Sequence, residues 1–220
     1  MAKDILTPFQ KKFLSLVAKN KPISGSFYLT GEIALAAYYL NHRYSEDLDF
    51  FSENEVDILA INVFLKEIKA AIGIKKIDFQ QSFNRNLFFH HTGSEILKAE
   101  FTYFPFHQIE PPDKRSGIRV NSLTDIATDK AFTIVQNPRA RDFIDLYCIL
   151  KSNVNISFEK LIKMARVKFD WHIDPIQLGT QLLKAQDIKD LPRMIKKLDH
   201  QAWRDFFIVK ARSLSDNIFK

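Results

Sequence analysis

The sequence has a single cysteine, Cys148, and no apolar run long enough to cross a membrane. One cysteine excludes an internal disulfide framework and a zinc site built from cysteines. A helix that spans a bilayer needs about 20 mainly apolar residues, and no segment approaches that length. The first residues, MAKDILTPFQKKF, lack the apolar stretch and the small-residue cleavage site of a secretory signal. We therefore expect a cytoplasmic protein that has no membrane partner.

The net charge of +6 comes entirely from the C-terminal part of the chain. Residues 1–138 contain 16 lysines and arginines against 16 aspartates and glutamates, whereas residues 139–220 contain 16 against 10. A basic surface is typical of proteins that bind polyanions such as RNA. A lysine-rich helical surface that faces solvent explains the same modest excess equally well. The candidates for an RNA-binding surface are Arg139, Arg141, Lys160, Lys163, Arg166 and Lys168.

The spacing of apolar residues divides the chain into two parts. In the first part, helices are expected at 4–20, 32–40 and 56–73, and strands at 26–30, 47–51, 75–83, 86–92, 95–106 and 117–120. From Ser122 onward the pattern is helical, and helices are expected at 123–136, 138–151, 157–168, 175–186 and 202–218. We therefore predict an α+β fold. Residues 1–121 form a small mixed β-sheet core with flanking helices, and residues 122–220 form an all-helical C-terminal domain.

Two aspartates, Asp47 and Asp49, lie in the segment DLDFF at residues 47–51. Alternation along a strand places both on one face, and Leu48 and Phe50 on the other. Two carboxylates on one face repel each other unless a cation compensates them. Mg²⁺ prefers oxygen ligands and shares them with phosphates, and a pair of such ions supports phosphoryl-type transfer. A solvated turn is the ordinary explanation of an isolated D-x-D, so further residues are needed to support a site.

A third carboxylate and a glycine complete a candidate nucleotide site. In the segment LKAEFTYF, Glu100 shares the polar face of its strand with Lys98 and Thr102, and it is the candidate third acidic residue. Gly31 joins a strand to the start of a helix, where free N–H groups favour a phosphate. Glycine also permits a close approach of the phosphate to the backbone. Gly31 and the acidic pair are separated by one helix, and this combination indicates a phosphate and metal site.

Two stretches of the sequence resemble a known family. LTGEIALAAYYLNHRYSEDLDFF, residues 29–51, resembles the G-G-T-A-L…H-R-x-S-x-D-L-D-F signature of the AbiEii/AbiGii-type nucleotidyltransferase toxins. These belong to the DNA polymerase β-like nucleotidyltransferase superfamily. SLTDIATDKAFTIVQNPRARDFIDLYCIL, residues 122–150, resembles the helical K…R-x-R-D-x-x-D-L segment of the same family. The likeness covers residues 26–150, and the last 70 residues carry no assignable motif.

The resemblance implies transfer of a nucleoside monophosphate from an NTP, with release of pyrophosphate and with Mg²⁺ or Mn²⁺ as cofactor. It implies that Asp47 and Asp49 are metal ligands, joined by Glu100 where the family has a third acidic residue. It also matches Lys130 to a lysine that contacts the nucleotide phosphates. The catalytic candidates are therefore Asp47, Asp49, Glu100, Lys130, Asp142 and Asp145. The substrate-binding candidates are Gly31, Glu32, Arg43, Ser45, Arg139 and Arg141.

Several of these assignments have structural alternatives. Arg139 and Arg141 either bind phosphate or RNA or pair with the neighbouring aspartates, and Arg141 lies four residues before Asp145 on one helix. Arg43 either contacts phosphate or orients Asp47, although an arginine after the end of a helix is also common on protein surfaces. Lys130 would ordinarily be a solvated lysine in mid-helix.

The resemblance further implies a toxin of a toxin–antitoxin or phage-defence pair, with RNA such as tRNA as acceptor and an antitoxin protein as partner. One departure from the family pattern affects the donor site: Glu32 stands where the family has a second glycine or serine, and Ile33 where it has threonine. A carboxylate at this point repels a triphosphate. Two alternatives therefore stay open, a catalytically weakened nucleotide- or protein-binding relative and a small-molecule nucleotidyltransferase of the antibiotic-modifying type.

Overall fold

The computed structural model describes residues 5–152 and 155–218, with side chains up to residue 214. The chain forms two compact units, one made of Met1–Tyr39 and Ser45–Ser122 and the other of Leu40–Tyr44 and Leu123–Lys220. The first unit is a mixed sheet with helices and the second is helical, so the predicted α+β class is confirmed. The division predicted at residues 121/122 placed residues 40–44 in the first part of the chain, whereas the structure groups them with the second unit.

A mixed seven-stranded sheet, counted over the described residues, forms the centre of the first unit in the order β3-β4-β5-β2-β1-β7-β6. The strands are β1 (Tyr28–Thr30), β2 (Leu48–Ser52), β3 (Lys76–Ser82), β4 (Arg85–His91), β5 (Ile96–Tyr103), β6 (Asp113–Arg115) and β7 (Ile118–Val120). β2 lies between β1, with which it is antiparallel, and β5, with which it is parallel. This pairing brings β2 and β5 together although they are distant in sequence.

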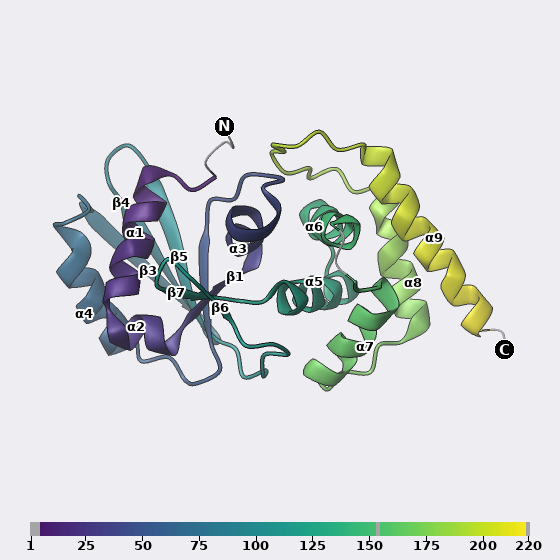
Figure 1. Cartoon of the computed structure of the whole chain (residues 1–220), viewed down its shortest axis with the longest axis horizontal. Coiled ribbons are helices and arrows are strands. Elements are labelled where there is room, and N and C mark those ends of the chain that lie inside the picture. Colours follow the sequence, from purple (N-terminus) through teal and green to yellow (C-terminus); the bar gives the residue numbers. More distant parts are fainter. Residues whose placement is uncertain (1–4, 153–154, 219–220) are drawn as a thin grey trace. The chain divides into compact units, whose positions relative to one another are not determined.

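Helices α1 (Pro8–Lys19), α2 (Lys21–Ser26) and α4 (Ile58–Lys69) lie along one face of this sheet (Figure 1). Phe13 of α1 packs edge-on against Phe64 of α4 at 6.1 Å between ring centroids. Beneath the helices, Phe50 of β2 stacks on Phe101 of β5 at 5.0 Å. Because side chains alternate along a strand, this apolar layer places the polar residues of β2 and β5 on the opposite face.

Two short elements of the first unit were absent from the sequence-based expectation. α2 contains proline and glycine, which are typical of loops, but its Asn20 cap accepts a hydrogen bond from the Ile23 amide at 3.1 Å. β6 is a three-residue strand paired with β7. The helix expected at 32–40 is also different, because α3 (Gly31–Leu35) continues as the π-helical turn η1 (Ala36–Leu40).

The second unit consists of helices packed on an aromatic core. They are α5 (Leu123–Gln136), α6 (Ala140–Lys151), α7 (Phe158–Lys168), α8 (Pro175–Leu183), the short 3₁₀ turn η2 (Lys184–Gln186) and α9 (His200–Ile218). Phe143 of α6 stacks on Trp203 of α9 at 6.0 Å and contacts Phe207 at 4.9 Å. None of the described helices has the length and apolarity required to cross a membrane.

The segment 40–44 is bound to the second unit by backbone hydrogen bonds. The Tyr44 amide donates to the Arg193 carbonyl at 3.0 Å, and the Ile195 amide donates to the His42 carbonyl at 2.8 Å. Arg43 forms an antiparallel bridge with Met194, which lies between those two partners. This short connection places the side chains of residues 42 and 43 in the interior of the unit.

Candidate active site

Asp49 lies directly against Gly31 on the polar face of the sheet. Asp49 pairs with Thr30 across the antiparallel β1–β2 ladder, and Gly31 follows at the start of α3. Gly31 has a φ of +68°, and a Cβ atom built on it would lie 2.6 Å from Asp49 Oδ2. A side chain at position 31 would therefore be strained and would also displace the carboxylate, so the glycine is required for the position of Asp49.

Asp49 belongs to a group of carboxylates on this face. The parallel β2–β5 ladder pairs Asp49 with Glu100, and Asp47 immediately precedes β2. Burial is the main cause that raises the pKa of Asp49 to about 7, and the negative charges of Glu100, Asp47 and Glu32 add to it, against a smaller opposing effect of Lys98. The raised pKa indicates a site with excess negative charge, which a bound cation would stabilise.

Two cations that the sequence did not single out for a role compensate part of this charge. Lys98 Nζ lies 2.7 Å from Asp47 Oδ2 and 3.8 Å from Glu100 Oε2. Arg85 donates from Nε and Nη2 to the two oxygens of Glu100, both at 2.7 Å. Burial raises the pKa of Glu100, but hydrogen bonds from Arg85 and Thr102 outweigh it and hold that pKa below the ordinary value.

We tested whether the carboxylates fit the divalent cation that the family resemblance implies. Asp47 and Asp49 supply the oxygen ligands that Mg²⁺ and Mn²⁺ prefer, and a cation beside them would favour the charged form of Asp49. Among the described residues, however, no three histidine, cysteine, aspartate or glutamate side chains are arranged to hold a metal together. The aspartate pair therefore fits a divalent cation, whereas Glu100 is engaged by Arg85.

A second charged cluster lies inside the helical unit and is centred on Asp145 of α6. Arg43 donates to this carboxylate through Nε at 2.6 Å and Nη2 at 2.8 Å, and His42 Nε2 lies 2.8 Å from Oδ1. The ammonium group of Lys130 lies 2.8 Å from the other oxygen. Asp145 is fully buried, and the effects of Lys130 and Arg43 overcome that of burial to hold its pKa well below the ordinary value.

Lys130 links Asp145 to Asp142, the other acidic residue near the start of α6. Its Nζ also lies 2.8 Å from Asp142 Oδ1, and the opposite oxygen of Asp142 accepts a hydrogen bond from Arg139 Nε at 2.8 Å. The Lys130 side chain is 8% exposed, so its ammonium group lies among these carboxylates and not at the surface. The structure therefore brings Lys130, Arg139, Asp142 and Asp145 together with Arg43, and binds them to one another.

The remaining predicted residues lie near these clusters or on their elements. Glu32 is half-buried in the first turn of α3, and its charge contributes to the raised pKa of Asp49. The Ser45 carbonyl is 3.5 Å from Gln10 Nε2, which also donates to the Glu46 carbonyl at 2.9 Å. Arg141 is half-buried on α6.

One residue of the expected RNA-binding surface is not on the surface. The Lys168 side chain is 1% exposed, and its ammonium group lies 2.9 Å from Asp125 and 2.7 Å from Asp129, both on α5. The expectation that Lys168 faces RNA was therefore wrong, because two acidic residues of α5 bind it in the interior. Lys160, Lys163 and Arg166 of α7 are exposed, as a polyanion surface requires.

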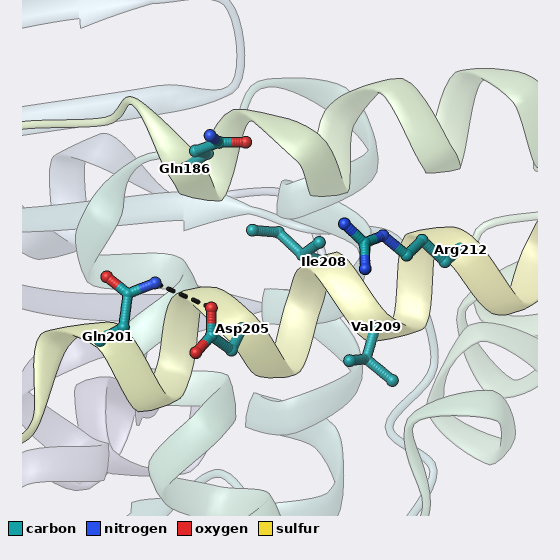
Figure 2. Close-up of a pocket in the computed structure, with 6 residues that line it drawn as sticks. All are labelled: Gln186, Gln201, Asp205, Ile208, Val209 and Arg212. Carbon is teal, nitrogen blue, oxygen red and sulfur yellow. Dashed lines mark hydrogen bonds between the residues drawn. The ribbon is translucent and has the colours of Figure 1, made fainter.

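A cavity of about 300 Å³ opens in the helical unit between η2 and α9, and none of the predicted site residues lines it (Figure 2). Its lining consists of Gln186, Gln201, Asp205, Ile208, Val209 and Arg212. Within it, Gln201 donates to Asp205 at 2.8 Å. Only one carboxylate lines this cavity, so it lacks the acidic pair that a nucleotidyl transfer site needs.

Comparisons with known proteins identify the family of the chain. The family model described as the nucleotidyl transferase AbiEii toxin of a type IV toxin–antitoxin system matches residues 13–214. An uncharacterized protein of Aquifex aeolicus (strain VF5) is 28% identical over 151 residues, which cover 67% of this chain and 68% of that protein.

Two solved structures share the fold at low identity. JHP933 from Helicobacter pylori matches with a TM-score of 0.58 and 22% identity, over 94% of this chain and 90% of that one. MenT4, a nucleotidyltransferase toxin from Mycobacterium tuberculosis H37Rv, matches with a TM-score of 0.53 and 13% identity, over 93% of this chain and 82% of that one. The shared architecture extends through both parts of the chain.

Proposed function

The chain belongs to the AbiEii family of nucleotidyltransferase toxins, and we propose that it transfers a nucleoside monophosphate from an NTP to an RNA acceptor, such as tRNA, in the presence of Mg²⁺ or Mn²⁺. The observation that carries this proposal is the position of Asp49 against Gly31, beside Asp47 and Glu100. This arrangement gathers three carboxylates on one face of the sheet, beside the glycine that the family resemblance assigns to a phosphate.

In this proposal Asp47 and Asp49 hold the divalent cation. When bound, the cation activates the acceptor oxygen and stabilises the charge of the departing pyrophosphate. Gly31 lets the Asp49 carboxylate lie against the start of α3. Glu32 and Ser45, which are close in sequence to Gly31 and Asp47, are assigned to the binding of the donor. Lys98 offsets the charge of Asp47 at 2.7 Å and orients it.

The second cluster supports a positioning role within the proposed enzyme. Asp145 binds Arg43, and Lys130 bridges Asp145 and Asp142, so these contacts are with protein groups. Arg139 is different because its side chain is 41% exposed and can also reach a phosphate. We therefore assign Arg139, together with Arg141, to substrate binding, and Lys130, Asp142, Asp145 and Arg43 to the internal support of the helical unit.

The RNA acceptor is supported by the basic surface of α7. Lys160 and Lys163 are exposed and lie three residues apart, so they are neighbours on the helix. Arg166 follows on the next turn and is exposed as well. The family is a toxin family of type IV systems, so we also propose an antitoxin partner and action in the cytoplasm, where NTPs and RNA are found.

A second candidate function is a weakened relative that binds nucleotide or protein without efficient transfer. The observation that favours it is the position of Glu32 in the first turn of α3, next to Gly31, where its negative charge adds to the causes that raise the pKa of Asp49. The same negative charge would oppose a triphosphate.

The test is incubation of the purified chain with each labelled NTP, total RNA and Mg²⁺ or Mn²⁺. Transfer predicts labelled RNA that disappears with Asp49→Asn and with a chelator. The absence of labelled RNA with all four NTPs, for a folded chain, would favour the weakened relative.

A further inference from the structure

Arg85 holds both oxygens of the carboxylate that family resemblance would assign to a metal. We propose that Arg85 excludes Glu100 from metal coordination, so that the chain itself binds one divalent cation through Asp47 and Asp49. This inference rests on the proposed metal-dependent transfer. It differs from a two-metal site in which three carboxylates share the ions.

The contacts of Glu100 leave little room for a metal. A carboxylate accepts about four hydrogen bonds. Arg85 occupies two positions at 2.7 Å, and Thr102 Oγ1 donates to Oε1 at 2.8 Å. Lys98 lies 3.8 Å from Oε2. To coordinate Glu100, a metal ion would have to break its bidentate pair with a guanidinium group, which is the strongest ion-pair geometry available to a carboxylate.

The backbone holds Arg85 in this position. Arg85 is the first residue of β4 and pairs with Thr102 of β5, so its side chain lies on the same face as Glu100. The adjacent hairpin tip is fixed by a hydrogen bond from the Tyr103 amide to the Asn84 carbonyl at 3.0 Å. Strand register therefore places Arg85 beside Glu100, and the 54% exposed Arg85 side chain reaches the carboxylate from the edge of the site.

The charges of the site also favour a cation. Four carboxylates act at this point, from Glu32, Asp47, Asp49 and Glu100. Lys98 and Arg85 supply two positive charges, fewer than the carboxylates, so the site stays acidic and a divalent cation would offset part of that charge. A second protein-bound ion would need another pair of free carboxylate oxygens, and Arg85 has taken those of Glu100.

The experiment is a titration of the nucleotide-free chain with Mn²⁺, with free Mn²⁺ measured by electron paramagnetic resonance. We expect one Mn²⁺ per chain in the wild type, lost with Asp49→Asn, and an affinity in Glu100→Gln that stays within about threefold of wild type. In Arg85→Gln the released Glu100 should bind a second Mn²⁺ or tighten the first by about tenfold. The double variant Arg85→Gln, Glu100→Gln should lose that gain.

A matched control and a conservative variant separate this effect from a general change of charge or fold. Lys76→Gln removes one positive charge from the neighbouring strand, where Lys76 pairs with Asp78 at 2.7 Å, and should leave Mn²⁺ binding unchanged. Arg85→Lys keeps the charge but not the fork, and should give an intermediate gain. Circular dichroism confirms that each variant is folded before titration.

The inference is overturned if Glu100→Gln loses Mn²⁺ as Asp49→Asn does, if the wild type binds two ions, or if Arg85→Gln binds Mn²⁺ as the wild type does. These outcomes leave metal-dependent transfer intact. A wild-type chain that binds no Mn²⁺, alone or with NTP, contradicts the proposed function itself and the inference with it.

Discussion

Arg43 and Asp145 lie 102 positions apart in the sequence and form a two-bonded ion pair inside the helical unit. Both side chains are buried, at 2% and 0% exposure. The pair joins a short connection of the N-terminal half to the centre of α6. An aspartate that the family pattern would place in the reaction is thereby occupied by protein groups.

Replacement of Asp145 by alanine should lower the free energy of unfolding by about 3–5 kcal/mol, because it leaves Arg43 and Lys130 buried without that carboxylate. Urea denaturation measures the loss. Asp205→Ala, which removes an exposed aspartate of α9, is the control and should change stability by less than about 0.5 kcal/mol. A double-mutant cycle of Arg43 and Asp145 should show strong coupling. Additive losses in that cycle would contradict a direct role of the pair.

Gly31→Ala should both destabilise the chain and reduce transfer. The left-handed φ of +68° and the approach of the new Cβ to Asp49 Oδ2 each oppose the substitution, and the strain alone costs about 1–3 kcal/mol. Gly25→Ala is the matched control, because Gly25 lies in α2 with open space around it and should be neutral or stabilising. Equal thermal stability of the two variants would show that the position of Asp49 does not depend on Gly31.

Glu32→Ser should tighten binding of Mg·NTP, since it removes a negative charge that acts on Asp49. Calorimetric titration gives the change directly. Glu67→Gln removes the same charge from an exposed position on α4, across the sheet from the carboxylates, and should leave the affinity unchanged. Weaker binding by Glu32→Ser would mean that Glu32 has a positive role in the donor site.

His90 should make the chain sensitive to mild acid. It is fully buried against Phe13 and Phe88, and neither ring nitrogen has a hydrogen-bond partner in the described part of the chain. Burial, followed by the charge of His91, lowers the pKa of His90 to about 4. Between its unfolded pKa of 6.5 and this value, the unfolded chain binds a proton that the folded chain does not.

The contribution of His90 to stability is therefore lost as pH falls from 6.5 toward 4, at up to about 1.4 kcal/mol per pH unit. His90→Leu should remove this dependence and should raise stability most at low pH. Urea denaturation of both proteins at pH 7.5 and pH 5 measures the difference. A gap between them that does not grow on acidification would contradict the assignment.

Charge reversal at Lys160 and Lys163 tests the RNA surface. If both contact phosphates, their reversal should weaken RNA modification and reduce the log–log salt slope by about 0.7 for each contact on a single strand. Binding of NTP should persist. Reversal of Lys66 and Lys69, which are exposed on α4 at the same spacing, is the control. If RNA labelling changes neither with salt concentration nor with the α7 reversal, α7 does not contact the acceptor.

The sequence was sufficient for the fold class, because period-two and helical spacing are set locally. The same alternation that places Asp49 and Glu100 on the polar faces of their strands can be read along the chain. The sequence could not reveal that β2 and β5 are parallel neighbours, since this depends on strand order. Arg85 illustrates the limit, because its role follows from the β4–β5 register alone.

Charged residues in helices were harder to assign. Lys168 belongs to a basic run that indicates a solvated surface, yet two aspartates of α5 draw it into the core. Arg43 follows a helix, where exposed arginines are common, yet its partner lies in α6. In each case a long-range ion pair decided the position, and no local pattern encodes such a pair.

The assignment of residues 40–44 to the helical unit determines how the chain can be divided. A fragment that begins at residue 123 would lack Arg43 and His42, and Asp145 would lose two of its partners. A fragment that ends at 121 would carry this connection without the carboxylate that binds it. Neither half is therefore a self-sufficient module for recombination or domain exchange. The helical part could be exchanged between relatives only together with residues 40–44, which interrupt the other unit in the sequence.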